Sequence, residues 1–177
     1  MKKFINPSLI ALVAAVLMLV ALFLPYASAR PGFTAIIQDL PEDACIDGTN
    51  ITLRSTLRVS MVEFLKIYKS SESGQALAKT LGSFVMAMGL AAVLAGLFAV
   101  LKKSVPMLFC GVLGFAAFYL HNGNYGNRGV LPGAEYRFGV GYYLFATAAI
   151  VLIAAGFWML RERKPSQKTQ ERPNTQQ

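Results

Sequence analysis

Residues 80–101 read TLGSFVMAMGLAAVLAGLFAVL, a run without a single charged side chain. A helix of about 20 apolar residues is long enough to cross the ~30 Å hydrocarbon layer of a bilayer. Three more stretches carry no charge either: residues 4–29, 104–127 and 138–160. The pattern predicts an all-α membrane protein, a four-helix transmembrane bundle. We place the spans at about 7–29, 79–101, 104–121 and 139–160.

The composition favours the same environment. Apolar residues make up 55% of the 177 residues and charged residues 15%, whereas a typical soluble domain is about 25% charged. We expect residues 1–164 to form a single membrane domain. The polar stretch 165–177 is predicted to be a disordered cytoplasmic tail, because it has no apolar side chain to bury.

Positive charge gathers in short segments between the spans. Lys2 and Lys3 precede the first span, Lys102 and Lys103 separate the second from the third, and the tail from Arg161 is also basic. Lysine and arginine mark cytoplasmic loops. The chain is therefore predicted to lie in the plasma or inner membrane with both termini in the cytoplasm.

The outer loops follow from this orientation and occupy residues 30–78 and 122–138. In residues 30–79 six basic and six acidic side chains cancel, so +7 of the net charge of +8 belongs to the three basic segments on the cytoplasmic side and the second outer loop adds one. A nucleic-acid partner is not expected, because such proteins cluster basic residues with aromatic ones on a folded face.

The N-terminus has two interpretations. Lys2, Lys3, the apolar run Leu9–Leu24, and Ala27 and Ala29 at an A-x-A site match a secretory signal peptide. Counted from Phe4 to Ala29, the same segment is long enough to span the membrane. We favour a retained first helix, and in both cases the segment that follows lies outside.

The first outer loop is predicted to fold into a small α+β cap. Residues 51–61 alternate between apolar and polar side chains, the period of a half-buried strand, and residues 33–38 are a weaker partner strand. In residues 60–72 the apolar side chains share one helical face, which indicates an amphipathic helix. The second outer loop, with the glycine- and asparagine-rich stretch 121–129, is predicted to be a turn.

Small residues recur at helical spacing in the spans, which lets helix backbones approach closely. They include Ala11, Ala14, Ala15 and Ala21 in the first span, Ser83, Ala87, Ala91 and Ala95 in the second, Gly111, Gly114 and Ala117 in the third, and Gly139, Gly141, Ala148 and Ala155 in the fourth.

The candidate interaction residues lie outside the apolar cores. Arg54 and Arg58 share one face of the predicted strand, and Arg128 and Arg137 belong to the second outer loop. Together they suit an anionic headgroup or an acidic partner. His121, the single histidine, is either a proton or metal contact or simply an interfacial ring, and it has no companion ligand in the sequence.

No catalytic constellation, cofactor motif or metal-ligand pattern is found in the sequence, so an enzyme is not expected. Ion-coupled transporters usually keep charged residues at membrane depth, and none lies there. We expect a non-enzymatic protein, a scaffold, accessory or sensor subunit, that acts by helix packing and outer-loop interactions. The alternative is a small oligomeric transporter or pore component. The expected partners are the lipid bilayer and either a second copy or another membrane protein.

The layout resembles a broad group of small bacterial four-span proteins of unknown function. The features that carry the resemblance are Phe23-Leu24-Pro25-Tyr26 ending the first helix, a long outer loop, a tight basic turn, and Gly139 and Gly141 opening the last helix. The topology is also similar to that of claudin-like proteins. Claudins have a tryptophan and a pair of cysteines in the first outer loop. This signature is missing here, because residues 30–78 contain no Trp and only Cys45.

Overall fold

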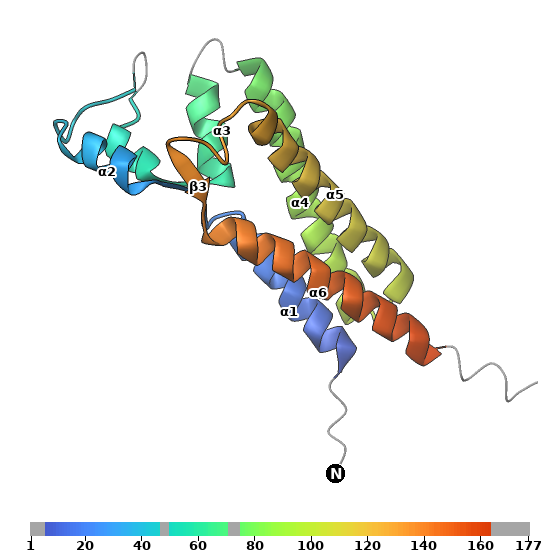
Figure 1. Ribbon diagram of the computed structural model, residues 1–177. Helices are drawn as coiled ribbons and strands as arrows, with labels where there is room; N and C mark the ends of the chain where they lie inside the picture. The colour runs from blue at the N-terminus through green and yellow to red at the C-terminus, as the bar shows by residue number, and fades with distance from the viewer. Residues whose placement is uncertain (1–5, 47–49, 71–74, 164–177) are drawn as a thin grey trace, which may run out of the picture.

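The chain forms a helical bundle with a small sheet at one end, as a computed structural model shows (Figure 1). The structure describes residues 6–46, 50–70 and 75–163. The predicted disordered tail, 165–177, lies outside the described residues. The helices are α1 (Pro7–Ala21), α2 (Pro31–Gln38), the 3-10 helix η1 (Leu53–Leu57), α3 (Met61–Ser70), α4 (Gln75–Val100), α5 (Ser104–Asn127) and α6 (Val140–Arg163). The strands are β1 (Pro25–Ala29), β2 (Arg58–Ser60) and β3 (Tyr136–Phe138).

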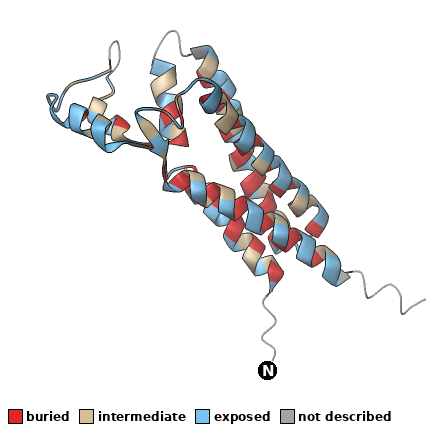
Figure 2. Ribbon diagram, viewed as in Figure 1, coloured by how far each residue is buried: buried red, intermediate tan, exposed pale blue. Residues whose placement is uncertain are grey.

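Three helices are long and apolar enough to cross a membrane: α4, α5 and α6. The fourth apolar helix, α1, is shorter, with 15 residues. Large apolar side chains such as Met86, Phe109 and Tyr119 are exposed on the outside of the bundle, whose buried residues lie between the helices (Figure 2). An apolar exterior of this kind suits contact with a lipid bilayer, and several such helices indicate a multi-pass membrane protein.

Small residues hold the helices close together, as their spacing predicts. Ala11, Ala14 and Ala15 of α1 are buried. At Gly114 of α5 an added Cβ would lie 3.1 Å from Cε of Met18 and 3.3 Å from Cβ of Ala91. Glycine at this position therefore lets α5 approach α1 and α4.

The first helix ends earlier than predicted. The sequence indicates a span over residues 7–29, but α1 ends at Ala21 and β1 begins at Pro25. The last turn tightens, with the Leu22 N–H donating to the Leu19 carbonyl and the Phe23 N–H to that of Val20. Proline has no N–H and favours an extended conformation in the residue before it, so the helix cannot continue.

Strand β1 is the centre of a three-stranded antiparallel sheet with the order β2-β1-β3. The strand pair predicted between 33–38 and 51–61 is therefore wrong: residues that look like the end of a membrane span form the central strand instead. Residues 33–38 belong to helix α2, which opens with Pro31 at a position where proline favours a helix.

Only the end of the predicted 51–61 strand is extended. Residues 53–57 form η1, and β2 covers Arg58–Ser60. The hydroxyls of Ser55 and Thr56 donate to the carbonyls of Thr52 and Leu53, at 2.6 and 2.7 Å. Such side-chain bonds offer the backbone an alternative to a strand ladder, which the alternating hydrophobicity does not reveal.

The amphipathic helix predicted at 60–72 is confirmed over Met61–Ser70 as α3, and residues 71–72 lie outside the described residues. It opens with a capping box: the Ser60 N–H donates to Oε2 of Glu63 at 2.8 Å, and the Glu63 N–H donates to Oγ of Ser60 at 3.2 Å. Met61 and Phe64 are buried on its apolar face.

The turn predicted at 121–129 is wrong for most of its length, because α5 continues to Asn127. His121 and Tyr125, one helical turn apart, are both buried there. Packing of this face outweighs the poor helix propensity of the Gly and Asn residues around it.

The start of α1, the α4–α5 turn and the end of α6 lie at one end of the bundle, and the sheet lies at the other (Figure 1). The Ser8 hydroxyl donates to the Ala99 carbonyl. Asn6, Lys102 and Glu162 border one small cavity at this end. The basic turn and the end of the last helix are therefore neighbours, on the side away from the sheet.

The start of α6 packs directly on the end of α1 and the start of β1. The Gly139 N–H donates to the Tyr26 carbonyl at 2.7 Å. A Cβ at Gly141 would lie 2.7 Å from the Leu24 oxygen and 2.8 Å from the Ala21 oxygen, and one at Gly139 would overlap the Pro25 carbonyl. The Gly-x-Gly pair is needed because backbone atoms fill the space that a side chain would take.

We expect Gly141→Ala to lower the free energy of unfolding by about 1–3 kcal/mol, the usual cost of forcing atoms into a packed site. Gly123→Ala is the control, because a Cβ there has no neighbour within 4 Å and alanine favours helix. Thermal unfolding of the detergent-solubilised protein measures both. Equal stability of the two variants would contradict the close packing at Gly141.

Candidate anion-binding groove

Two arginines flank the central strand on one face of the sheet. Ser28 of β1 pairs with Arg58 of β2 on one side and with Arg137 of β3 on the other. Residues directly opposite each other in neighbouring strands point to the same face. With strands about 4.8 Å apart, the two arginine backbones lie roughly 10 Å from each other. Two long guanidinium side chains can therefore converge on one anion above Ser28.

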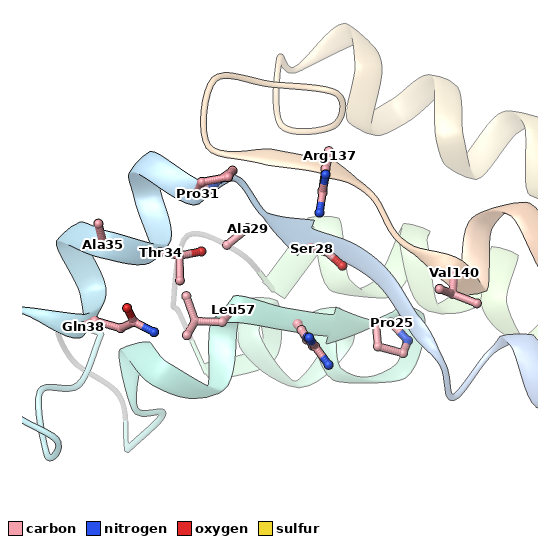
Figure 3. A pocket seen from close by; sticks show the side chains of 11 residues that line it. Pro25, Ser28, Ala29, Pro31, Thr34, Ala35, Gln38, Leu57, Arg137 and Val140 are labelled. Atoms are coloured by element: carbon pink, nitrogen blue, oxygen red, sulfur yellow. The ribbon is translucent and has the colours of Figure 1, made fainter.

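A groove of about 740 Å³ covers this face of the sheet. Thr34 and Gln38 of α2 line one end, and Pro25 and Val140 line the other, where β1 and α6 begin (Figure 3). The polar end of the groove is therefore formed by α2, and its apolar end lies where α6, one of the long apolar helices, begins.

The groove is electropositive. Its lining contains Arg58 and Arg137 and, among the described residues, no acidic side chain. Neither guanidinium forms an ion pair within the part of the chain that the structure describes. The first turn of α2, which borders the groove at Pro31 and Thr34, adds the positive end of a short helix dipole. Planar guanidinium groups suit carboxylate and phosphate oxygens.

The opposite face of the sheet packs on the bundle. Ala27 and Val59 are opposite each other and buried. The register shifts between Pro25 and Ala27, so Tyr26 is an extra residue and is buried next to Ala27. A bulge of this kind lets two successive side chains face the core. With Tyr26 and Ala27 both buried against the bundle, the position of the strand that carries Ser28 is fixed.

Tyr26 lies at the centre of an aromatic cluster that joins the sheet to the helices. Rings packed around it are those of Phe64, Phe118, His121, Tyr125, Phe138 and Tyr142. The Tyr26 hydroxyl donates to Oδ1 of Asn122 at 3.1 Å. Burial, reinforced by Tyr142, raises the pKa of the Tyr26 hydroxyl, which therefore stays protonated and able to donate.

The predicted interaction residues separate into two groups. Arg58 and Arg137 meet in the groove. Arg54 is not in it, because η1 replaces the predicted strand and Arg54 pairs with Glu42 instead. The prediction that Arg54 and Arg58 share a strand face is therefore wrong.

Arg128 and His121 also lie apart from the groove. Nε of Arg128 donates to Oδ1 of Asn124 at 3.3 Å. Burial raises the pKa of the Tyr68 phenol and the nearby Arg128 lowers it in part. His121 is fully buried in the aromatic cluster, and no group of three or more potential ligands able to hold a metal exists among the described residues.

Sequence reasoning missed Ser28, Thr34 and Gln38. Ser28 lies in the stretch assigned to the first membrane span, and the other two lie in a segment assigned to a strand. No local signal separates a strand from a helix end in an apolar, alanine-rich run; only Pro25 marks the boundary.

No protein-family model matches the chain, and no significant similarity is found to curated proteins or to solved structures. The groove must therefore be interpreted from its own geometry.

We expect Tyr26→Phe to lower the free energy of unfolding by about 0.5–1.5 kcal/mol, because it removes the bond to Asn122 and leaves the ring packing intact. Tyr143→Phe is the control, since Tyr143 is exposed. Thermal unfolding in detergent measures both. A Tyr26→Phe variant as stable as Tyr143→Phe would show that the ring alone holds the cluster together.

Proposed function

We propose that this chain is a non-enzymatic, multi-pass membrane protein that binds an anionic group at the outer face of the membrane, between Arg58 and Arg137. The proposal includes four membrane crossings, both termini in the cytoplasm and the sheet outside. The protein would act as an accessory or sensor subunit, with the bundle as a membrane anchor and the groove as its recognition site.

The distribution of charge supports this orientation. The α4–α5 turn, which contains Lys102 and Lys103, lies at the end of the bundle opposite the sheet (Figure 1), and Arg161 lies near the end of α6. Basic residues favour the cytoplasmic side, which supports an outer position for the sheet. Helix α1, about 22 Å long, is short for a span, and a short span is accommodated by local thinning of the bilayer and by flanking residues.

The packing of α1 and β1 supports retention of the N-terminal segment. Ala11, Ala15 and Met18 are buried between helices. The A-x-A site, Ala27 to Ala29, lies within the central strand, which pairs on both sides. A chain that began at Arg30 would lose the middle of the sheet and one helix of the bundle.

Cysteine labelling tests topology and retention together. We expect a membrane-impermeant maleimide to label Cys45 in cells with an intact membrane, because Cys45 is exposed in the cap. The labelled protein should have the mass of the full 19.2 kDa chain plus one label. Buried Cys110 should react only after denaturation and serves as the internal control. Labelling of Cys45 only after lysis, or a mass that begins at Arg30, would contradict the proposal.

The juxtaposition of Arg58, Ser28 and Arg137 carries the binding proposal. The two arginines belong to strands more than 70 residues apart in sequence, yet the sheet register places both beside one serine. Two exposed positive charges in one groove, without an acidic neighbour in the described lining, repel each other, and an anion between them would offset this repulsion by attracting both.

We expect millimolar glycerol 3-phosphate to raise the melting temperature of the detergent-solubilised protein, because a ligand that binds only the folded state stabilises it. Arg58→Gln and Arg137→Gln should each weaken binding about tenfold or more, since a hydrogen bond to a charged group contributes about 1.5–3 kcal/mol. Arg54→Gln is the matched control, because Arg54 pairs with Glu42 outside the groove. The same stabilisation in all three variants would refute the site.

The bundle interior gives no support to a pore within one copy. Met18, Met88, Met107 and Leu152 are fully buried between the described helices. A pathway for ions needs polar groups along its length, and these side chains are apolar.

A further inference from the structure

We propose that the anion held in the groove is the headgroup of an anionic phospholipid, and that one of its acyl chains lies along the seam between α1 and α6. This inference rests on the proposed function and names the ligand of the same site. The inference follows from a second groove, from the alignment of this groove with the first, and from the length of the path through both.

The second groove lies between α1 and α6 and has a volume of about 300 Å³. Leu9, Val13 and Leu17 line it from α1, and Leu144, Thr147 and Val151 line it from α6. Leu9 and Val13 are 59% and 51% exposed, so the groove is open to its surroundings. It faces the hydrocarbon layer when the bundle spans a membrane, and its apolar walls suit an alkyl chain.

The two grooves share one side of α6. Val140, the first residue of α6, lines the arginine groove, and Leu144, one helical turn further, lines the seam. On α1, which runs antiparallel to α6 (Figure 1), Leu17 lies nearest the sheet. A molecule with a phosphate between the arginines can therefore extend its chain directly into the seam without crossing a polar region.

The path from the arginine groove to the end of the seam matches the length of one acyl chain. From Val140, which lines the groove, to Val151, the last seam residue of α6, a helix rises about 16 Å, and an acyl chain of one leaflet covers half of the ~30 Å hydrocarbon layer, about 15 Å. A lipid of the outer leaflet would thus have its headgroup at the sheet and its chain beside α1 and α6. The arginines select the charge, and the seam selects a chain rather than a free phosphate.

An acidic protein segment would satisfy the arginines but not the seam. The apolar end of the groove, which Pro25 and Val140 line, distinguishes between a peptide and a lipid. Peptide backbone at that depth would have unsatisfied polar groups, whereas a glycerol backbone and acyl chain would not. The lipid is therefore the occupant that uses both ends of the site.

Native mass spectrometry of the full chain, purified in detergent, tests the proposal with three probes. These are phosphatidylglycerol, phosphatidylcholine with the same chains, and glycerol 3-phosphate, which has no chain. We expect phosphatidylglycerol adducts to exceed phosphatidylcholine adducts about tenfold, and Arg58→Gln or Arg137→Gln to remove this preference. Arg54→Gln should keep it.

Thr147→Phe and Val13→Phe test the seam by filling it. Each should lower phosphatidylglycerol retention roughly fivefold, since the chain loses a few van der Waals contacts, and leave glycerol 3-phosphate binding unchanged. Val93→Phe, at a lipid-exposed position of α4, is the control for a bulky residue on the bundle surface. Melting temperatures of all variants check that each one folds.

The outcomes separate the two proposals. If the seam variants retain phosphatidylglycerol fully while the arginine variants lose glycerol 3-phosphate, the lipid assignment is overturned and the anion site stands. Tighter arginine-dependent binding of a polyglutamate peptide than of phosphatidylglycerol would likewise replace the lipid by an acidic partner. If the arginine variants change none of the probes, both proposals fail.

Discussion

The rest of the structure depends on the contact between the start of α6 and the α1–β1 junction. Gly139 and Gly141 lie against the carbonyls of Ala21, Leu24 and Pro25, so close that backbone meets backbone. This contact brings β3, which immediately precedes α6, beside β1. Without it the third strand would have no partner, and Arg137 would not lie opposite Ser28. A packing constraint at the sheet end of the bundle thus sets the geometry of the site.

Strand β1 serves two environments at once. Tyr26 and Ala27, brought to the same side by the bulge, face the aromatic cluster and anchor the sheet to α3, α5 and α6. Ser28, the next residue, faces the groove. Because the buried face is held by ring packing and by the bond from Tyr26 to Asn122, the exposed face has a fixed position from which its arginines can act. The cluster positions the groove without belonging to it.

Much of the bundle follows from hydrophobicity alone, because long charge-free runs with small residues at helical spacing have few other structures available. The second, third and fourth apolar helices and the amphipathic α3 are all predicted correctly. Where the prediction fails, tertiary contacts outweigh local pattern. Residues 25–29 are apolar enough for a helix but pair on both sides as a strand, and residues 121–127 have turn composition but continue α5 because His121 and Tyr125 are buried.

Only part of the candidate site could be predicted from the sequence, for the same reason. Arg58 and Arg137 could be proposed as interaction residues from their outer-loop positions, but their meeting depends on a central strand that periodicity does not reveal. Arg54, four residues before Arg58, has the same place in the alternating pattern of 51–61. In the structure it lies in η1, where hydroxyl-to-carbonyl bonds take the place of a strand ladder. Side-chain bonds of this kind depend on backbone geometry and leave no periodic signal.

The balance of charge in the sequence does not reveal how the charged side chains are arranged in space. Residues 30–79 have six basic and six acidic side chains, yet the charges are not mixed in three dimensions. Glu42 pairs with Arg54 outside the groove, which has two arginines and no acid among its described lining residues. The backbones of Arg58 and Arg137 are about 10 Å apart, a little more than the Debye length of about 8 Å at physiological salt, so the repulsion between the two side chains is partly screened. The anion proposed for the groove would offset the repulsion that remains.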